Sequence, residues 1–168
     1  MHDREVAMAA LLRASGVQSL RGLRILDVGC GRGDLLRQLL SYDAEPSCLF
    51  GLDLLNDRVQ EARRFSPHFY FVCGSGSQLP FPDGSFELVV QFTVFTSVLS
   101  ESFRRSMASE ILRVMSPGGR LLWYDFAYDN PRNPDVRGIG RAEIRRLFPG
   151  CTMKLRRVTL APPLGRIV

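Results

Sequence analysis

Three glycines alternate along the chain, and the first of them lies two residues after an aspartate. The stretch reads ILDVGCGRGD, with Gly29, Gly31 and Gly33 after Asp27. Glycine weakens a helix or strand by roughly 0.5–1 kcal/mol relative to alanine, so such a cluster needs a cause. Either the backbone turns sharply here, or a ligand comes very close to it. A strand followed by a glycine loop and a helix is an arrangement that binds anions and nucleotides.

The spacing of the glycines narrows the class of ligand. A dinucleotide fingerprint, G-x-G-x-x-G, requires a glycine at position 34, where Asp34 stands, and no Gly-Lys-Ser/Thr follows as in a P-loop. Asp27 is poorly placed for a pyrophosphate and suits a cationic or hydroxyl-bearing ligand. A second acid, Asp53, ends the apolar run LFGLD, and an acid at this distance accepts hydrogen bonds from ribose hydroxyls. The alternatives are a helix cap for the acid and a tight turn without a ligand for the glycines.

A parallel sheet is the framework that would bring these residues together. Short apolar runs alternate with stretches of helical period, which is typical of an α/β protein with a doubly wound, mostly parallel, Rossmann-like sheet and helices on both faces. We expect strands at 23–28, 48–54, 68–74, 86–92, 120–128 and 151–162, and helices at 6–14, 34–42, 56–65 (with Asn56 as N-cap), 101–115 (closed by Pro117–Gly119) and 141–148. Because parallel strands end at one edge, Asp27 and Asp53 should lie close together.

Composition and charge limit the class of protein. The chain has 168 residues, of which 45% are hydrophobic and 23% charged, as expected for one soluble domain spanning residues 1–168. No apolar run approaches the roughly 20 residues of a membrane span, and the N-terminus has no secretory pattern, so we expect a cytoplasmic protein. Four cysteines and two histidines show no metal-ligand spacing, which predicts no metal site.

The motifs, taken in order, resemble those of the class I S-adenosylmethionine-dependent methyltransferases, in particular the small-molecule group called type 11. ILDVGCGRGD is similar to the first motif of the family and LFGLDLLNDRV to its acidic second strand. GSGSQLPFPDGSFELVV is similar to the third and fourth strands, and EILRVMSPGGRLLWYDF to the closing motif. The resemblance covers most of the chain, from about Arg24 to Phe148.

The resemblance implies S-adenosylmethionine as the cofactor, with S-adenosylhomocysteine as the product. The loop from Gly29 through Cys30 and Gly31 to Gly33 would pass the methionine part, whose amino end Asp27 would hold. Asp53 would bind both ribose hydroxyls, and Leu54 would pack on the adenine face.

The resemblance also places residues on the far side of the cofactor. The family usually has an aspartate at the adenine amino group, where this chain has Ser75 with Gly76 beside it. A serine accepts more weakly than a carboxylate, so we expect weaker cofactor binding, with the contact shared by Ser77 and Gln78. Gln91, at the end of the fourth expected strand, would line the opening shared by cofactor and substrate.

The implied reaction moves a methyl group to a small-molecule acceptor by direct in-line displacement. Alignment of the reacting atoms contributes on the order of 7–11 kcal/mol, whereas a general base contributes roughly 10²–10⁴-fold, so we expect no essential base. Tyr124 and Asp125 are weak candidates for catalytic residues, and the alternative for Asp125 is a cap on the next loop.

Aromatic and basic residues near the same edge indicate the character of the acceptor. The aromatic residues, which suit an apolar or partly planar acceptor, are Phe92, Phe95, Phe126 and Tyr128, with core packing as the alternative for the first two. Arg132 and Arg137 either meet an anionic group or brace the loop that carries them.

Two other functions stay open. From Pro131 onward nine basic residues face two acidic ones, which keeps an RNA or protein methyltransferase as an alternative, with nucleic acid a less favoured partner. Ser75 and the short C-terminal segment keep a non-catalytic cofactor-binding module as the other. Only LGRIV follows the sixth expected strand and its prolines, so we expect the family's last strand to be missing and the chain to be truncated. An incomplete sheet edge would favour a homodimer through that edge.

Overall fold

A parallel sheet of five strands forms the centre of the protein. The computed structural model describes residues 2–156 and 158. The strands are β1 (Ile25–Val28), β2 (Leu49–Asp53), β3 (Tyr70–Cys73), β4 (Phe86–Phe92) and β5 (Met115–Tyr124). Their order across the sheet is β3-β2-β1-β4-β5, and every neighbouring pair is parallel. The predicted doubly wound α/β fold is therefore confirmed.

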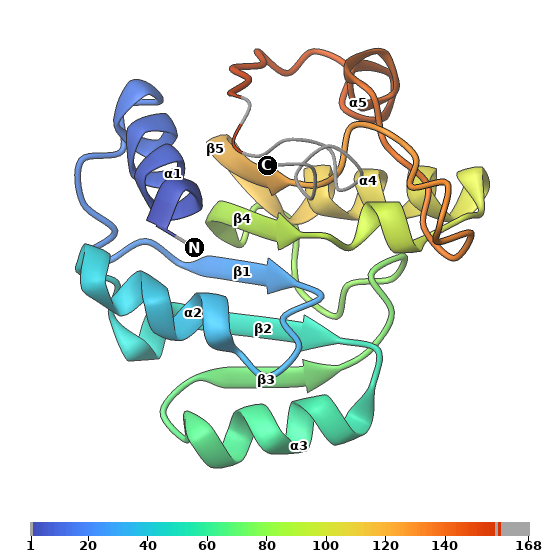
Figure 1. The fold of residues 1–168 in the computed structure, drawn as a ribbon. Helices are drawn as coiled ribbons and strands as arrows, with labels where there is room; N and C mark the ends of the chain where they lie inside the picture. The colour runs from blue at the N-terminus through green and yellow to red at the C-terminus, as the bar shows by residue number, and fades with distance from the viewer. Residues whose placement is uncertain (1, 157, 159–168) are drawn as a thin grey trace.

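Helices cover both faces of this sheet (Figure 1). The helices α1 (His2–Ala14), α2 (Asp34–Leu39) and α3 (Asn56–Phe65) lie on one face, and α4 (Glu101–Val114) and α5 (Arg141–Leu147) on the other. Successive strand residues alternate between the two layers of the core: Ile25 packs beneath the first group of helices and Leu26 beneath the second. Both sides of β1 are thus buried, and its apolar sequence has no exposed face.

The direction of winding reverses beside β1. From β1 the chain proceeds outward to β2 and β3, then returns to place β4 on the other side of β1 and β5 beyond it. Ligands of open α/β sheets bind at the carboxyl ends of the strands where this reversal occurs. The fold thus places the loop after β1 at the expected binding edge.

The boundaries of β5 differ from the prediction. The strand begins at Met115, directly after α4, and ends at Tyr124 rather than at residue 128. Its pairing with β4 shifts between Phe86↔Met115 and Leu88↔Arg120, so Pro117–Gly119 form an irregular part of the strand and not a turn that closes the helix. The physical reason is that the edge of β4 beside this segment is free, so the chain pairs with β4 both before and after the irregular residues.

Two other expectations were wrong. Asn56 is the first residue of α3 and not its N-cap; Leu55 occupies that position, and its N–H donates to Asp53 Oδ1 at 2.9 Å. Residues 151–156 form no strand. The remainder of that predicted strand, apart from residue 158, lies outside the described residues.

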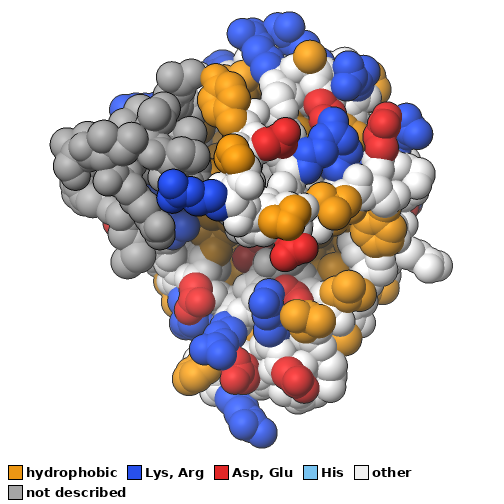
Figure 2. All heavy atoms as spheres, turned by 45° about the vertical axis from the view of Figure 1, so that its right-hand side comes forward, with side chains coloured by type: hydrophobic (Ala, Val, Ile, Leu, Met, Phe, Trp, Pro, Cys, Tyr) orange, Lys and Arg blue, Asp and Glu red, His pale blue; other side chains and the backbone are white. Residues whose placement is uncertain are grey.

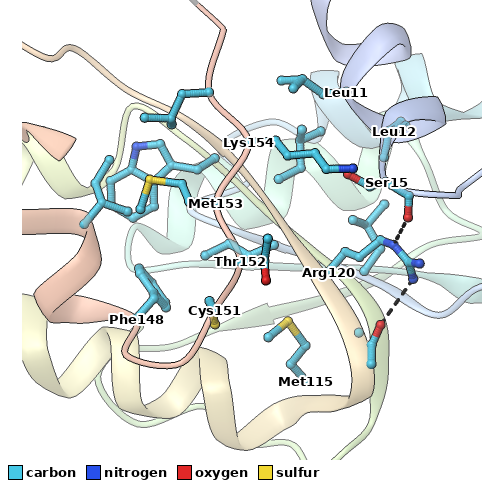
Figure 3. Close-up of a pocket in the computed structure, with 18 of the residues that line it drawn as sticks. Leu11, Leu12, Ser15, Met115, Arg120, Phe148, Cys151, Thr152, Met153 and Lys154 are labelled. Carbon is cyan, nitrogen blue, oxygen red and sulfur yellow. Dashed lines mark hydrogen bonds between the residues drawn. The ribbon is translucent and has the colours of Figure 1, made fainter. Parts of the chain in front are cut away.

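The outer side of β5 borders a cavity. Within residues 2–156 and 158, no backbone hydrogen bond joins that side of the strand to another segment. A cavity of about 570 Å³ runs along it, between α1, α5 and residues 150–155 (Figure 3). Lys154 Nζ donates to Ala14 O, and Arg120 Nε to Ser15 O at 2.6 Å, so two cations fasten the end of α1 beside the cavity. None of the residues predicted to bind the cofactor lines it.

Candidate functional site

The three glycines of the loop after β1 have different surroundings. Gly29, Gly31 and Gly33 all have positive φ, at 79°, 54° and 77°. A Cβ at Gly29 would overlap Val94 Cγ2, and one at Gly33 would lie 2.9 Å from the Phe71 ring. A Cβ at Gly31 would meet nothing within 4 Å. Packing thus explains two of the glycines, whereas the third borders open space at the edge where a ligand is expected.

Asp53 fastens this loop to the end of β2. Its Oδ2 accepts the N–H of Gly31 at 2.8 Å, while its Oδ1 accepts the N–H of Leu55. The side chain is buried, yet each carboxylate oxygen can accept a further hydrogen bond. Asp53 therefore holds the loop in place and retains acceptor capacity for hydroxyl groups.

Asp27 is a buried carboxyl that lacks a partner. It is 2% exposed, and within the part of the chain that the structure describes it accepts no hydrogen bond. Burial, and secondly the charge of Asp53, raise the pKa of Asp27 to about 8. A buried polar group without a partner is uncommon in a folded protein, and a cation or hydrogen-bond donor supplied by a ligand would satisfy it. This is the feature of the site that best fits the amino end of S-adenosylmethionine.

Cys30 lies between the glycines and faces the sheet. Its thiol is buried, and a Cβ at Gly51 of β2 would lie 2.8 Å from its sulfur. Burial, together with the charges of Asp27 and Asp53, raises the pKa of the Cys30 thiol. The thiol stays protonated, which suits it to packing beneath the loop and not to nucleophilic chemistry.

The segments after β2 and β3 carry the residues predicted to meet adenine. Leu54 follows Asp53 and is 67% exposed, so its side chain is available to a flat ligand. Ser75 and Ser77 are half-buried, and their hydroxyl oxygens lie 2.8 Å apart. Gly76 between them packs against α4, because a Cβ there would lie 2.9 Å from Met107 Cε. The two serines thus contact each other and Gln78 is exposed, whereas their shared contact with adenine stays a prediction.

The loop after β4 packs against the glycine loop. Gln91 is fully buried, and its Oε1 accepts the N–H of Val94 at 3.3 Å. Val94 in turn packs against Gly29. Sequence reasoning missed Val94, because no local pattern shows that a side chain 65 positions later fills the space that Gly29 leaves.

Asp125 holds the same loop from β5. Its Oδ2 accepts the N–H groups of Phe95 (3.1 Å) and Thr96 (3.3 Å), at the start of the 3-10 helix η3 (Phe95–Ser97), and its Oδ1 accepts from Thr96 Oγ1 and Phe126 N. Burial raises the pKa of Asp125, and these hydrogen bonds partly oppose that increase. The carboxylate caps the preceding loop and not only the following one, and its role as a base stays a prediction.

Of the four aromatic residues predicted to suit the acceptor, Phe92 and Phe95 pack against the core, and the other two are exposed. Tyr124 packs on Phe92 with ring centroids 5.3 Å apart, and the Arg4 guanidinium of α1 lies over both rings at 5.5 and 5.8 Å. Phe126 and Tyr128 are exposed. Phe95 is fully buried against Trp123, so core packing, the stated alternative, is correct for it.

The predicted loop arginines differ in their contacts. Arg137 pairs with Glu143 of α5 at 3.2 Å, and Glu143 also lies 3.0 Å from the buried Arg104 of α4. Arg132 and Arg137 are both exposed, and the ion pair with Glu143 lets Arg137 brace its loop. Figure 2 turns the carboxyl ends of the strands toward the viewer. Acidic side chains lie around a hollow on this face, and hydrophobic side chains border it. Among the described residues there is no cluster that could hold a metal ion, and no helix is both long and apolar enough to span a bilayer.

The chain is similar in sequence to known methyltransferases. A family model described as a methyltransferase domain matches residues 25–119, from β1 into β5. The chain is 31% identical over 139 residues to a ubiquinone/menaquinone biosynthesis C-methyltransferase of Methylobacterium nodulans, covering 79% of this chain and 52% of that protein. It is 34% identical over 131 residues to a sterol 24-C-methyltransferase of Aspergillus fumigatus, covering 70% and 32%. The chain thus spans about half or less of the length of these relatives.

The fold also has solved counterparts. The YcgJ protein of Bacillus subtilis superposes with a TM-score of 0.67 at 21% identity, over 85% of this chain and 66% of that one. At this identity the likeness concerns the fold alone.

Proposed function

The chain belongs to the class I S-adenosylmethionine-dependent methyltransferases, and from that premise we propose that it transfers a methyl group from S-adenosylmethionine to an apolar small-molecule acceptor by direct in-line displacement. The observation that carries the proposal is the pair of buried carboxyls, Asp27 and Asp53, whose charges interact, together with the open position at Gly31, which donates its N–H to Asp53. One carboxyl has no partner and the other has spare acceptor capacity. A ligand with an ammonium group and two ribose hydroxyls would satisfy both.

Each part of the cofactor has a residue suited to it. Asp27 would accept from the amino group, Asp53 from the ribose hydroxyls, and Leu54 would cover the adenine ring. The pair Ser75 and Ser77 would meet the adenine amino group. When bound, S-adenosylmethionine supplies a methyl group activated by the positive charge on its sulfur.

The acceptor would lie against the exposed aromatic border. Phe126 and Tyr128 are exposed in the loop after β5, and Phe92 is half-buried at the end of β4. The named relatives act on a quinone and a sterol, both largely apolar, which supports an acceptor of the same character. The protein contributes mainly by holding the acceptor in line, since alignment outweighs what a single base provides.

The first experiment measures cofactor binding. Calorimetric titration with S-adenosylhomocysteine should show micromolar binding by the wild type and none by Asp53→Ala. The matched control, Asp57→Ala, removes an exposed carboxylate from α3 and should bind normally. NADH should not bind. An intact wild type that does not bind S-adenosylhomocysteine would refute the proposal.

The second experiment identifies the acceptor class. Methyl-labelled S-adenosylmethionine is incubated with the protein and with quinone, sterol, fatty-acid, tRNA and protein acceptors. Label on an apolar small molecule supports the proposal, whereas label on tRNA or protein alone favours the alternative suggested by the basic C-terminal segment. Binding without transfer to any acceptor would indicate a cofactor-binding module.

We also propose that the open side of β5 mediates association into a homodimer. An edge strand exposes backbone N–H and C=O groups that pair readily with another strand. Light scattering during gel filtration measures the mass directly, and a monomer at all concentrations would refute this part of the proposal.

A further inference from the structure

Thr93 adopts a backbone conformation that its residue type disfavours. Its φ is +58°, and it is exposed at the carboxyl end of β4. Positive φ is rare for any residue except glycine and is a genuine outlier for a β-branched one. Such strain persists only where the surrounding structure imposes it, and it gathers at functional sites.

The surroundings of Thr93 impose this conformation from several directions. The N–H of Thr93 donates to Tyr124 O at 2.7 Å, and its carbonyl accepts from Ser97 Oγ at 3.3 Å. The next residue, Val94, is pressed against Gly29. Asp125 holds the two residues that follow. The loop is fixed on both sides of Thr93, so its conformation is part of the built structure of the site.

A second non-glycine residue with positive φ, Asp43, shows why threonine is unexpected at position 93. Among the described residues, Asp43 is the other non-glycine position with positive φ. Asp43 ends a short 3-10 helix, a turn position, and aspartate tolerates this conformation. Glycine or asparagine would fit position 93 with less strain, so the threonine side chain has a use that the turn alone does not require.

The hydroxyl of Thr93 is oriented by its own contact. Oγ1 donates its hydrogen to Phe92 O at 2.7 Å, which leaves the lone pairs of the oxygen as acceptors at the exposed end of β4. The oxygen can therefore recognise a group that carries a hydrogen. A group with no hydrogen to donate would gain nothing from it.

We propose that Thr93 contacts the methyl acceptor, with Oγ1 accepting a hydrogen bond from the O–H or N–H whose heavy atom receives the methyl group. The inference rests on the proposed methyltransferase function and narrows the acceptor to a hydroxyl, phenol or amine compound. In the atom that is methylated, it sets this chain apart from the two C-methyltransferases named above. That compound gains the methyl group and loses its proton to water, while the electron pair of the broken carbon–sulfur bond stays on sulfur. Thr93 orients the nucleophile and does not act as the base.

The test compares three substitutions. Thr93→Val keeps the shape and removes the hydroxyl, so kcat/KM should fall by at least about tenfold with S-adenosylhomocysteine affinity unchanged. Thr93→Ser retains the hydroxyl and should restore most of the activity. Thr93→Gly should raise the Tm by about 2 °C while losing activity like the valine variant. The matched control is Thr152→Val, an exposed threonine outside the site, which should behave as wild type.

The outcomes separate this inference from the function on which it rests. Wild-type activity on a hydroxyl or amine acceptor with equal kcat/KM in Thr93→Val would overturn the role of Thr93 and leave the methyltransferase intact. A lower Tm in Thr93→Gly would overturn the strain argument. Cofactor binding by the wild type without transfer to any acceptor would overturn the proposed function and this inference with it.

Discussion

Replacement of Asp27 by asparagine should change how the stability of the ligand-free protein depends on pH. In the folded protein, burial and the charge of Asp53 raise the pKa of Asp27 from 3.8 to about 8. Between these two values the folded protein keeps a proton that the unfolded chain has lost. The free energy of unfolding of the wild type should therefore fall as pH rises through this range, and level off above about pH 8. Asparagine does not titrate, so the variant lacks this decline.

The size of the effect follows from one proton. A difference of one bound proton changes the free energy of unfolding by about 1.4 kcal/mol for each pH unit. Between pH 5 and pH 7 the wild type should thus lose about 3 kcal/mol relative to Asp27→Asn. Asp27 is 2% exposed, so screening by solvent does not reduce this figure appreciably.

Urea unfolding at pH 5, 6 and 7, at constant ionic strength and without cofactor, measures the difference. Asp57→Asn serves as the control, because it removes an exposed carboxyl and should run parallel to the wild type. A constant difference between wild type and Asp27→Asn across this range would refute the reasoning. It would mean that Asp27 is ionised in the folded protein despite its burial.

The same carboxyl should make cofactor binding depend on pH. An ammonium group beside Asp27 favours the ionised form of the carboxyl. The affinity for S-adenosylhomocysteine should therefore rise by up to about tenfold for each pH unit between pH 6 and 8. Calorimetry should find this slope absent in Asp27→Asn, and equal slopes would contradict the contact. Gly29→Ala should lower the free energy of unfolding by about 2–4 kcal/mol, because the new methyl group meets Val94 and the φ is positive. Gly22→Ala, with φ +72° and nothing within 4 Å, should cost about 1 kcal/mol, and equal losses in urea would show that Val94 moves aside. Asp125→Ala should cost about 1–3 kcal/mol, because it leaves neighbouring backbone N–H groups without an acceptor. The pH profile of kcat should keep its shape in Asp125→Asn, and the loss of an inflection there would establish Asp125 as the base.

Local pattern was sufficient to predict the elements that have a clear period. The strand Phe86–Phe92 was predicted with the bounds that the structure has, and the helix Asn56–Phe65 was too, except that Asn56 was predicted to be its N-cap. The first is a continuous apolar run between turn residues, and the second has apolar positions at helical spacing. The meeting of Asp27 and Asp53 was predictable as well, since parallel strands bring their carboxyl ends to one edge.

Contacts between distant segments could not be predicted. Residues 116–119 read as a turn because of Pro117 and Gly118, yet pairing with β4 draws them into a strand. No pattern in the sequence indicates that Arg4 lies over Phe92 and Tyr124, because this position depends on how α1 packs. The backbone of Thr93 is likewise fixed by Tyr124 of β5, and the next residue packs against Gly29 in the loop after β1. The positions of the two candidate acids could thus be predicted from sequence, whereas the packing of the loop after β4 depends on the fold.

The open side of β5 has a consequence for amide hydrogen exchange. β4 is paired on both sides, so successive amides along it donate to one neighbour or the other and should exchange slowly. In β5 only alternate amides face β4; within the described residues those between them have no strand to donate to. Exchange along Arg120–Tyr124 should alternate between slow and fast from one residue to the next. A uniform slow pattern would reveal that another strand occupies this side in solution.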